Sequence, residues 1–151
     1  MQIVGTRSEN MDFEEFLARP LFAHLATSSE EGARDVPLWF LWENGALWFI
    51  VVVSENTFHQ RVQQDSRTAV GIVDFDVETG LVQHVSFRGR ATVEPWDIER
   101  AKRVLSKYLG NDMEKWDQKR FVDGLNQPDE WLFVKFEPET AMVRDQSYIP
   151  S

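Results

Sequence analysis

Residues 81–95, LVQHVSFRGRATVEP, constrain the fold more than any other part of the chain. Their side chains alternate between apolar or small and polar, which is the period of a β-strand with one buried face. The apolar side comprises Val85, Phe87, Gly89, Ala91 and Val93, and the polar side comprises His84, Ser86, Arg88, Arg90 and Thr92. We therefore predict a long β-strand with one face in the core.

Shorter apolar runs bounded by turn residues predict further strands. These runs cover 21–29, 33–42, 46–53, 67–75, 130–138 and 140–146. Asn44 and Gly45 lie between two of the runs, and Asn-Gly in that position predicts a tight hairpin. The count of strands predicts a mainly β (α+β) fold, a small antiparallel barrel with short helices at its rim.

Helical patterns are fewer and mostly short. One helix is predicted after Asp12, which can cap it, and a second over 54–64, with Ser54 or Asn56 as its cap. A longer amphipathic helix is predicted over 97–109. Because no linker or repeat interrupts the chain, we expect residues 1–151 to form a single domain.

Composition excludes several classes of function. Lys and Arg total 16 against 25 Asp and Glu, so the formal net charge of −9 disfavours nucleic acid and anionic membranes as partners. The chain has no cysteine, which excludes disulfides, thiolate metal sites and cysteine nucleophiles. It also lacks an apolar run long enough for a transmembrane helix and the pattern of a signal peptide, so we expect a cytoplasmic protein.

Motifs for metal binding and hydrolysis are also missing. His24, His59 and His84 have no metal-ligand spacing, and no serine lies in a nucleophile motif, so we expect no metal site and assign no catalytic residue. The alternating acids Asp74 and Asp76, with Glu78, could hold a hard cation, but a solvated turn is the favoured interpretation.

Two regions could receive an anion. The first is the polar face of the 81–95 strand, where His84, Arg88 and Arg90 could bind a phosphate or carboxylate or could pair with acids of the chain itself. The second joins Arg34 to the start of the helix predicted over 54–64, where free backbone N–H groups favour an anion.

The high aromatic content indicates a well-filled core, an exposed apolar surface or a site for a flat ligand. The chain has six Trp and eleven Phe but two Tyr. We expect Trp48, Trp96 and Trp131 in the core and Trp116 as a loop anchor. Trp39 and Trp42, on the strand that contains Arg34, could face a flat ligand or a partner chain.

The order and spacing of four segments resemble the flavin-binding split-barrel family related to pyridoxamine 5′-phosphate oxidase. The segments read FAHLATSSEEGARDVPLWFLWENGALWFI, FHQRVQQDSRTAVGIV, VSFRGRATVEP and WLFVKFEP. The resemblance extends from about Phe16 to Arg144. It implies an antiparallel split β-barrel with flanking short helices, a homodimer, and FMN in grooves between the two chains.

Site residues follow from the resemblance by position. Arg34 matches a basic residue that contacts the flavin phosphate. Asn56, Thr57 and Phe58 fall on the segment that usually offers hydroxyl and basic groups to that phosphate. His84 matches a polar residue that contacts the flavin. The strand that lines the flavin ring corresponds to Val36, Pro37 and Leu38, and Trp39 falls where the true oxidase has a lysine for the substrate phosphate.

Departures from the family pattern define the alternatives. Phe58 replaces the usual phosphate-binding lysine, so the phosphate role can pass to Arg34, His59, Arg61 or Arg88. Trp39 in place of the substrate lysine argues against a true pyridoxamine-phosphate oxidase. The implied activity is flavin-dependent oxidoreduction of an unidentified small molecule. The alternatives are a binding module for haem, a deazaflavin or another cofactor, and a dimeric scaffold without cofactor.

Overall fold

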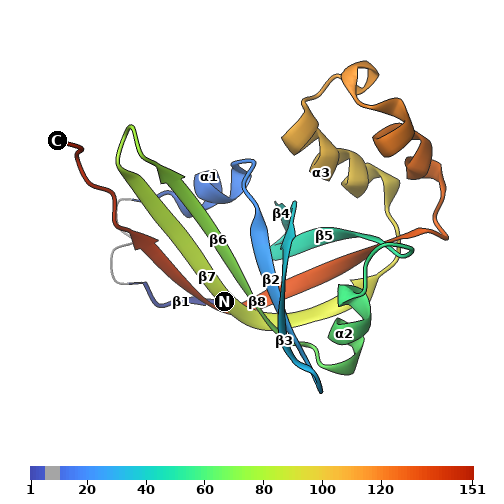
Figure 1. The fold of residues 1–151 in the computed structure, drawn as a ribbon, viewed down its shortest axis with the longest axis horizontal. Helices are drawn as coiled ribbons and strands as arrows, with labels where there is room; N and C mark the ends of the chain where they lie inside the picture. The colour runs from blue at the N-terminus through green and yellow to red at the C-terminus, as the bar shows by residue number, and fades with distance from the viewer. Residues whose placement is uncertain (6–10) are drawn as a thin grey trace.

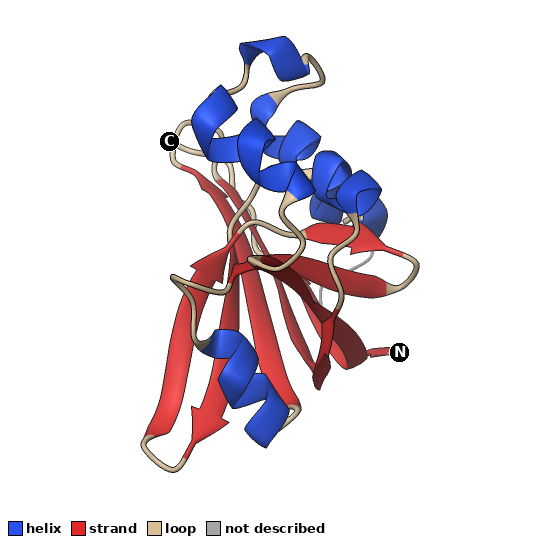
Figure 2. Cartoon of the chain, turned by 90° about the vertical axis from the view of Figure 1, so that its right-hand side faces the viewer, coloured by secondary structure: helices blue, strands red, loops and turns tan. Residues whose placement is uncertain are grey.

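A computed structural model describes residues 1–5 and 11–151 as a curved, mostly antiparallel sheet with helices packed around it (Figures 1 and 2). The strands are β1 Gln2–Ile3, β2 Ala23–Ser29, β3 Gly32–Leu38, β4 Leu41–Glu43, β5 Ala46–Val52, β6 Arg67–Asp76, β7 Leu81–Glu94 and β8 Trp131–Asp145. They are arranged in the order β3-β2-β6-β7-β8-β5-β4, and β1 pairs in parallel with β8. The predicted mainly β, antiparallel fold with short helices is confirmed.

Three α-helices and three short helical turns connect the strands. The α-helices are α1 Phe13–Ala18, α2 Phe58–Gln64 and α3 Ile98–Leu109, and the turns are η1 Met113–Lys115, η2 Gln118–Val122 and η3 Asp123–Asn126. Figure 1 shows α3 and the turns after it grouped at one end of the sheet, away from α2. Among the described residues, no helix has the length and apolar character needed to cross a bilayer.

The predicted long strand is β7, and it is paired on both sides. It pairs with β6 from Leu81 to Arg90 and with β8 from Gln83 to Glu94. The start of β7 therefore pairs only with β6, and its end pairs only with β8. Val85 and Phe87 are buried, whereas Ser86 is exposed, as the alternation predicted. This face of β7 forms the centre of the core that β2, β6, β8 and α2 surround.

Capping and turn signals in the sequence are mostly confirmed. Asn44 and Gly45 take φ angles of 54° and 75°, the left-handed values that a two-residue hairpin between β4 and β5 requires. The side chain of Asp12 accepts a hydrogen bond from the backbone N–H of Glu15 at 3.0 Å and caps α1. Helix α2, however, begins later than predicted, with Thr57 as its N-cap residue.

The two strands predicted over 130–138 and 140–146 are one strand, β8. Pro138 cannot donate to a ladder, and a turn there was the expected consequence. Instead, the β7–β8 register shifts between Arg88 and Gly89, opposite Pro138. A Cβ atom on Gly89 would collide with the backbone of Glu137, so glycine permits this close approach. The bulge thus absorbs the proline without ending the strand.

The strand predicted over 33–42 is interrupted, because α3 binds the chain where the interruption occurs. The backbone N–H of Phe40, between β3 and β4, donates to the Tyr108 hydroxyl at 3.1 Å. That hydroxyl in turn donates to the carbonyl oxygen of Leu21 at 2.6 Å. The backbone group that a continuous strand would pair with a neighbour is therefore satisfied by a helix side chain.

Lys107, the neighbour of Tyr108, reinforces the same junction. Its Nζ atom donates to the carbonyl oxygens of Leu17 and Phe40, both at 3.0 Å, and lies 3.5 Å from the centroid of the Phe40 ring. Burial lowers the pKa of Lys107 from its ordinary value of 10.5 to about 7. Two hydrogen bonds therefore fix the Lys107 side chain in a buried environment that disfavours its positive charge.

We expect the free energy of unfolding to rise with pH between about 7 and 10 because of Lys107. In this window the unfolded chain keeps a proton on the lysine that the folded chain has lost. Chemical denaturation across the window measures the slope. Lys107→Met should remove this component, whereas Lys102→Met, on the same helix, should keep it. Identical slopes in wild type and Lys107→Met would contradict the assignment.

Candidate cofactor and ligand site

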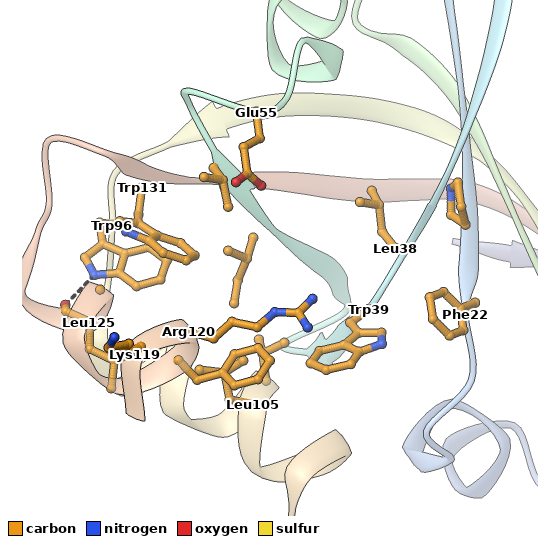
Figure 3. Close-up of a pocket in the computed structure, with 16 residues that line it drawn as sticks. Phe22, Leu38, Trp39, Glu55, Trp96, Leu105, Lys119, Arg120, Leu125 and Trp131 are labelled. Carbon is orange, nitrogen blue, oxygen red and sulfur yellow. Dashed lines mark hydrogen bonds between the residues drawn. The ribbon is translucent and has the colours of Figure 1, made fainter. Parts of the chain in front are cut away.

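Two hollows lie along β3 on either side of the turn between β5 and α2. The first, here called the basic recess, has a volume of about 900 Å³ and includes Arg34, Thr57 and Arg61 in its lining. The second, here called the aromatic cavity, has a volume of about 480 Å³. Its lining includes Phe22, Pro37, Leu38, Trp39, Glu55, Trp96, Arg120, Phe121 and Trp131 (Figure 3).

Strand β3 and the β5–α2 turn each contribute to both hollows. Arg34 lines the recess and Leu38 lines the cavity, and the four residue steps between them along the strand span roughly 13 Å. In the turn, Thr57 lines the recess and Glu55 lines the cavity. One extended ligand could therefore reach from the recess to the cavity along β3.

Arg61 forms the floor of the basic recess. Its side chain is largely buried, and its Nε atom donates to Thr27 Oγ1 at 2.8 Å. Its Nη1 atom donates to Thr57 Oγ1, also at 2.8 Å. Arg34, on the neighbouring edge strand β3, is exposed beside it. Neither guanidinium forms an ion pair with any carboxylate of residues 1–5 or 11–151.

Electrostatics make this recess favourable for an anion. Burial lowers the pKa of Arg61, and the positive charge of Arg34 lowers it further. Two like charges in one recess repel each other until an anion is placed between them. Glu30, Glu31 and Asp65 also line the recess, but Asp65 is already paired with Arg67 at 2.9 Å. The recess therefore places the buried Arg61 and the exposed Arg34 beside the Thr57 hydroxyl, with Glu30 and Glu31 also in its lining.

Rings held by other parts of the chain form the walls of the aromatic cavity. Trp39 stacks on Tyr108 with centroids 4.6 Å apart and an interplanar angle of 3°. Across the cavity, the indole N–H of Trp96 donates to the carbonyl oxygen of Leu125 at 2.9 Å. Trp131 lies beside Trp96, with their ring centroids 5.4 Å apart. Burial raises the pKa of Tyr108 to about 12, so its hydroxyl stays protonated in neutral solution.

The structure separates the predicted site residues into groups. Arg34 and Thr57 line the basic recess, and Pro37, Leu38 and Trp39 line the aromatic cavity. Arg34, Pro37 and Leu38 come from β3, Trp39 follows that strand, and Thr57 comes from the β5–α2 turn, so the structure brings these predicted residues to two neighbouring hollows. The remaining predicted residues, Val36, Asn56, His59, His84 and Arg88, lie in the lining of neither hollow.

Three of these residues have packing or turn roles. Val36 packs against the core inside the sheet. Asn56 Oδ1 accepts the backbone N–H of Val52 at 2.8 Å and so shapes the β5–α2 turn. His59 is buried, and burial, followed by the charge of Arg61, lowers its pKa. Phe58, which replaces the family's lysine, is also buried in the core and fills neither hollow.

His84 and Arg88 lie on the outer face of the sheet, opposite the core. They alternate along β7 with Val85 and Phe87, which face inward. Arg90, farther along the same face, pairs with Glu139 at 3.3 Å, which is the intramolecular pairing considered as the alternative. Asp74, predicted just past a strand, lies within β6 and pairs with Arg19 at 3.0 Å.

Several lining residues were not recognised from the sequence as site residues. Trp96 and Trp131 were predicted as core, but they are partly exposed and line the aromatic cavity. Trp42, predicted to face a flat ligand or a partner chain, packs against Phe13 and Phe87 and donates its indole N–H to Glu14. The cavity side chains of Glu55, Lys119 and Arg120 carried no sequence signal, because they occur in polar segments that resemble ordinary surface.

Comparison with known proteins supports the fold. No protein-family model and no curated protein matches the chain. Among solved structures, an FAD-binding protein from Mesorhizobium loti is 18% identical with a TM-score of 0.64, over 89% of this chain and 92% of that chain. HutZ, the haem storage protein from Vibrio cholerae, is 16% identical with a TM-score of 0.64, over 94% and 97%.

A third structure connects the fold to the family named above. It is a Listeria innocua protein provisionally assigned as a pyridoxamine 5′-phosphate oxidase, 16% identical with a TM-score of 0.60, over 89% of this chain and 95% of that chain. Identities this low establish the fold and not the ligand. The chain has the split-barrel fold of the proteins related to pyridoxamine 5′-phosphate oxidase, as its sequence predicted.

Proposed function

We propose that the chain binds FMN and acts as a flavin-dependent oxidoreductase on a small molecule. The observation that carries this proposal is the basic recess, where Arg34 and Arg61 approach each other without a carboxylate partner in the described part of the chain. A phosphate dianion would relieve their repulsion and accept from both guanidinium groups. The resemblance in sequence assigns the same role to Arg34.

The rest of an FMN molecule would extend along β3 toward the aromatic cavity. Pro37 and Leu38 offer apolar surface at the end of the strand, which suits a flat ring system. A bound flavin supplies hydride and electron transfer, and the protein supplies binding and orientation. In this arrangement, Arg34, Thr57 and Arg61 hold the phosphate, and the end of β3 keeps water from one side of the ring.

Haem is the weaker candidate for the cofactor. Haem in proteins usually needs an axial ligand, and histidine is the common one. His24 is exposed and pairs with Asp35, His59 is buried, and His84 is on the outer face of the sheet. None of the three lines the basic recess or the aromatic cavity. The positions of these histidines therefore favour a phosphorylated flavin.

We also propose a homodimer that pairs the outer faces of two sheets, with the cofactors in grooves between the chains. On β6, the outward-facing Val73 and Phe75 are 58% and 59% exposed, which is unusual for large apolar residues on a sheet. Small residues next to them, Gly71 and Ser86, would allow a second sheet to approach closely. Such a dimer would bring His84 and Arg88 toward the partner chain.

Arg34→Ala should weaken FMN binding by at least about tenfold, or about 1.4 kcal/mol. The phosphate would lose one of the two guanidinium groups that hold it. Titration calorimetry with FMN and with riboflavin, which lacks the phosphate, separates this effect from any change in ring binding. Riboflavin affinity should be the same in wild type and variant.

The control for this experiment is Lys115→Ala, which removes an exposed cation of η1 outside both hollows. It should leave FMN affinity unchanged. Equal affinities of the wild type for FMN and riboflavin would show that the phosphate is not recognised, and the proposal would then fail.

Val73→Asp should convert the dimer to a monomer, because each chain would bury an unpaired carboxylate in the interface. Light scattering coupled to size-exclusion chromatography measures the mass directly. Val77→Asp makes the same change in the turn after β6, outside the paired strands, and should leave the dimer intact. A wild-type mass of one chain would contradict the proposed dimer.

A further inference from the structure

The aromatic cavity is lined by tryptophan side chains that have no role in binding the phosphate of the proposed cofactor. Figure 3 shows the Trp96–Trp131 pair on one side and Trp39 with Phe22 on the other, with open space between them. Its volume of about 480 Å³ is within the range of pockets that hold small molecules. A ligand in this space would therefore lie between Trp39 and the Trp96–Trp131 pair.

The walls of this space are held in place before any ligand binds. Trp39 is fixed by its stacks on Tyr108 and on Phe121, whose ring centroids are 4.6 Å and 6.0 Å from its own. Trp96 stacks on Phe133 with centroids 5.1 Å apart. Gly124 packs so closely under Trp131 that a Cβ atom there would lie 2.6 Å from the indole Cζ2 atom. A ligand would therefore lose little free energy in ordering these rings.

Arg120 supplies a charge at the centre of the cavity. It follows Asp117, whose side chain caps η2 by accepting the backbone N–H of Arg120 at 3.2 Å. The guanidinium lies 5.0 Å from the Phe121 ring centroid and points into the space between the two walls (Figure 3). Within the described residues it has no carboxylate partner.

Glu55 limits the orientation of an anionic ligand. Its carboxylate points into the cavity from the β5–α2 turn, on the other side from η2 (Figure 3). A negative group next to Glu55 would be repelled, whereas the same group at Arg120 would be attracted and could be held by two parallel hydrogen bonds. The acidic end of a ligand would thus lie at Arg120.

We propose that the aromatic cavity binds a planar aromatic carboxylate between Trp39 and Trp96, with its carboxylate on Arg120. Resting on the proposed function, this inference makes such an acid the substrate class of the flavin site. The position of Leu38, at the end of β3 that would support the flavin ring, brings the ligand next to that ring. Lys119, also in the lining, adds a second positive charge near Arg120.

The test uses 2-naphthoate and its neutral counterpart 2-naphthamide as probes, with titration calorimetry on the full chain. The wild type should bind the acid more tightly than the amide. Arg120→Gln should weaken binding of the acid by about tenfold and leave binding of the amide unchanged. Glu55→Gln should strengthen binding of the acid, because a repulsive charge is removed.

Lys115→Gln is the matched control, since it removes an exposed cation of η1 outside the cavity and should change neither affinity. Equal binding of acid and amide, or an unchanged affinity in Arg120→Gln, would overturn the proposal. Displacement of 2-naphthoate by saturating FMN would also overturn it, because the cavity would then belong to the cofactor.

Parallel titrations keep this inference distinct from the proposed function. Arg120→Gln should not alter FMN affinity, and Arg34→Ala should not alter 2-naphthoate affinity. If FMN does not bind the wild type while 2-naphthoate binding still depends on Arg120, the flavin proposal fails and the cavity remains an aromatic-acid site. If FMN binds and neither naphthyl probe does, the cavity proposal fails alone.

Discussion

The hydroxyl group of Tyr108 holds the geometry on which the aromatic cavity depends. It donates to the Leu21 carbonyl at 2.6 Å and accepts the backbone N–H of Phe40 at 3.1 Å, so α3 is fixed against the break between β3 and β4. The same ring carries Trp39 in a parallel stack. Without this contact, β3 and β4 could continue as one strand, and Trp39 would no longer form a wall of the cavity. A buried polar group with its partners satisfied thus positions an apolar site.

Ion pairs elsewhere in the chain make the unpaired arginines useful indicators of where an anionic ligand could bind. In a chain of net charge −9, most guanidinium groups can find a carboxylate, and several do, as Arg103 does with Glu43 at 2.6 Å. Among the residues that the structure describes, five arginines form no such pair: Arg34, Arg61, Arg88, Arg120 and Arg144. Three of these five, Arg34, Arg61 and Arg120, line one of the two hollows. An acidic protein that leaves cations unpaired in concave places favours anionic ligands there.

Local patterns predicted the elements well, and long-range contacts explain where they failed. The alternation of β7 and the Asn44–Gly45 turn depend on neighbouring residues, so the sequence alone reveals them. The break after Leu38 depends on Tyr108, a residue far along the chain, and could not be read from the strand itself. Of the site, Arg34 and Trp39 were predicted through the family resemblance. Trp131 was missed, because an indole at a cavity wall and one in the core have the same sequence pattern.

The replacement of the family's lysine by Phe58 is best understood together with Arg61. Phe58 points into the core. A lysine at this position would either bury its ammonium group there or have to extend it past the sheet to reach solvent. Arg61 lies one turn farther along α2 and reaches the recess while its guanidinium is held by Thr27 and Thr57. A guanidinium fixed by two hydroxyl groups loses less freedom on binding a phosphate than a mobile ammonium would. Under the proposed function, the departure from the family pattern moves the phosphate-binding cation from position 58 to Arg61 along the helix.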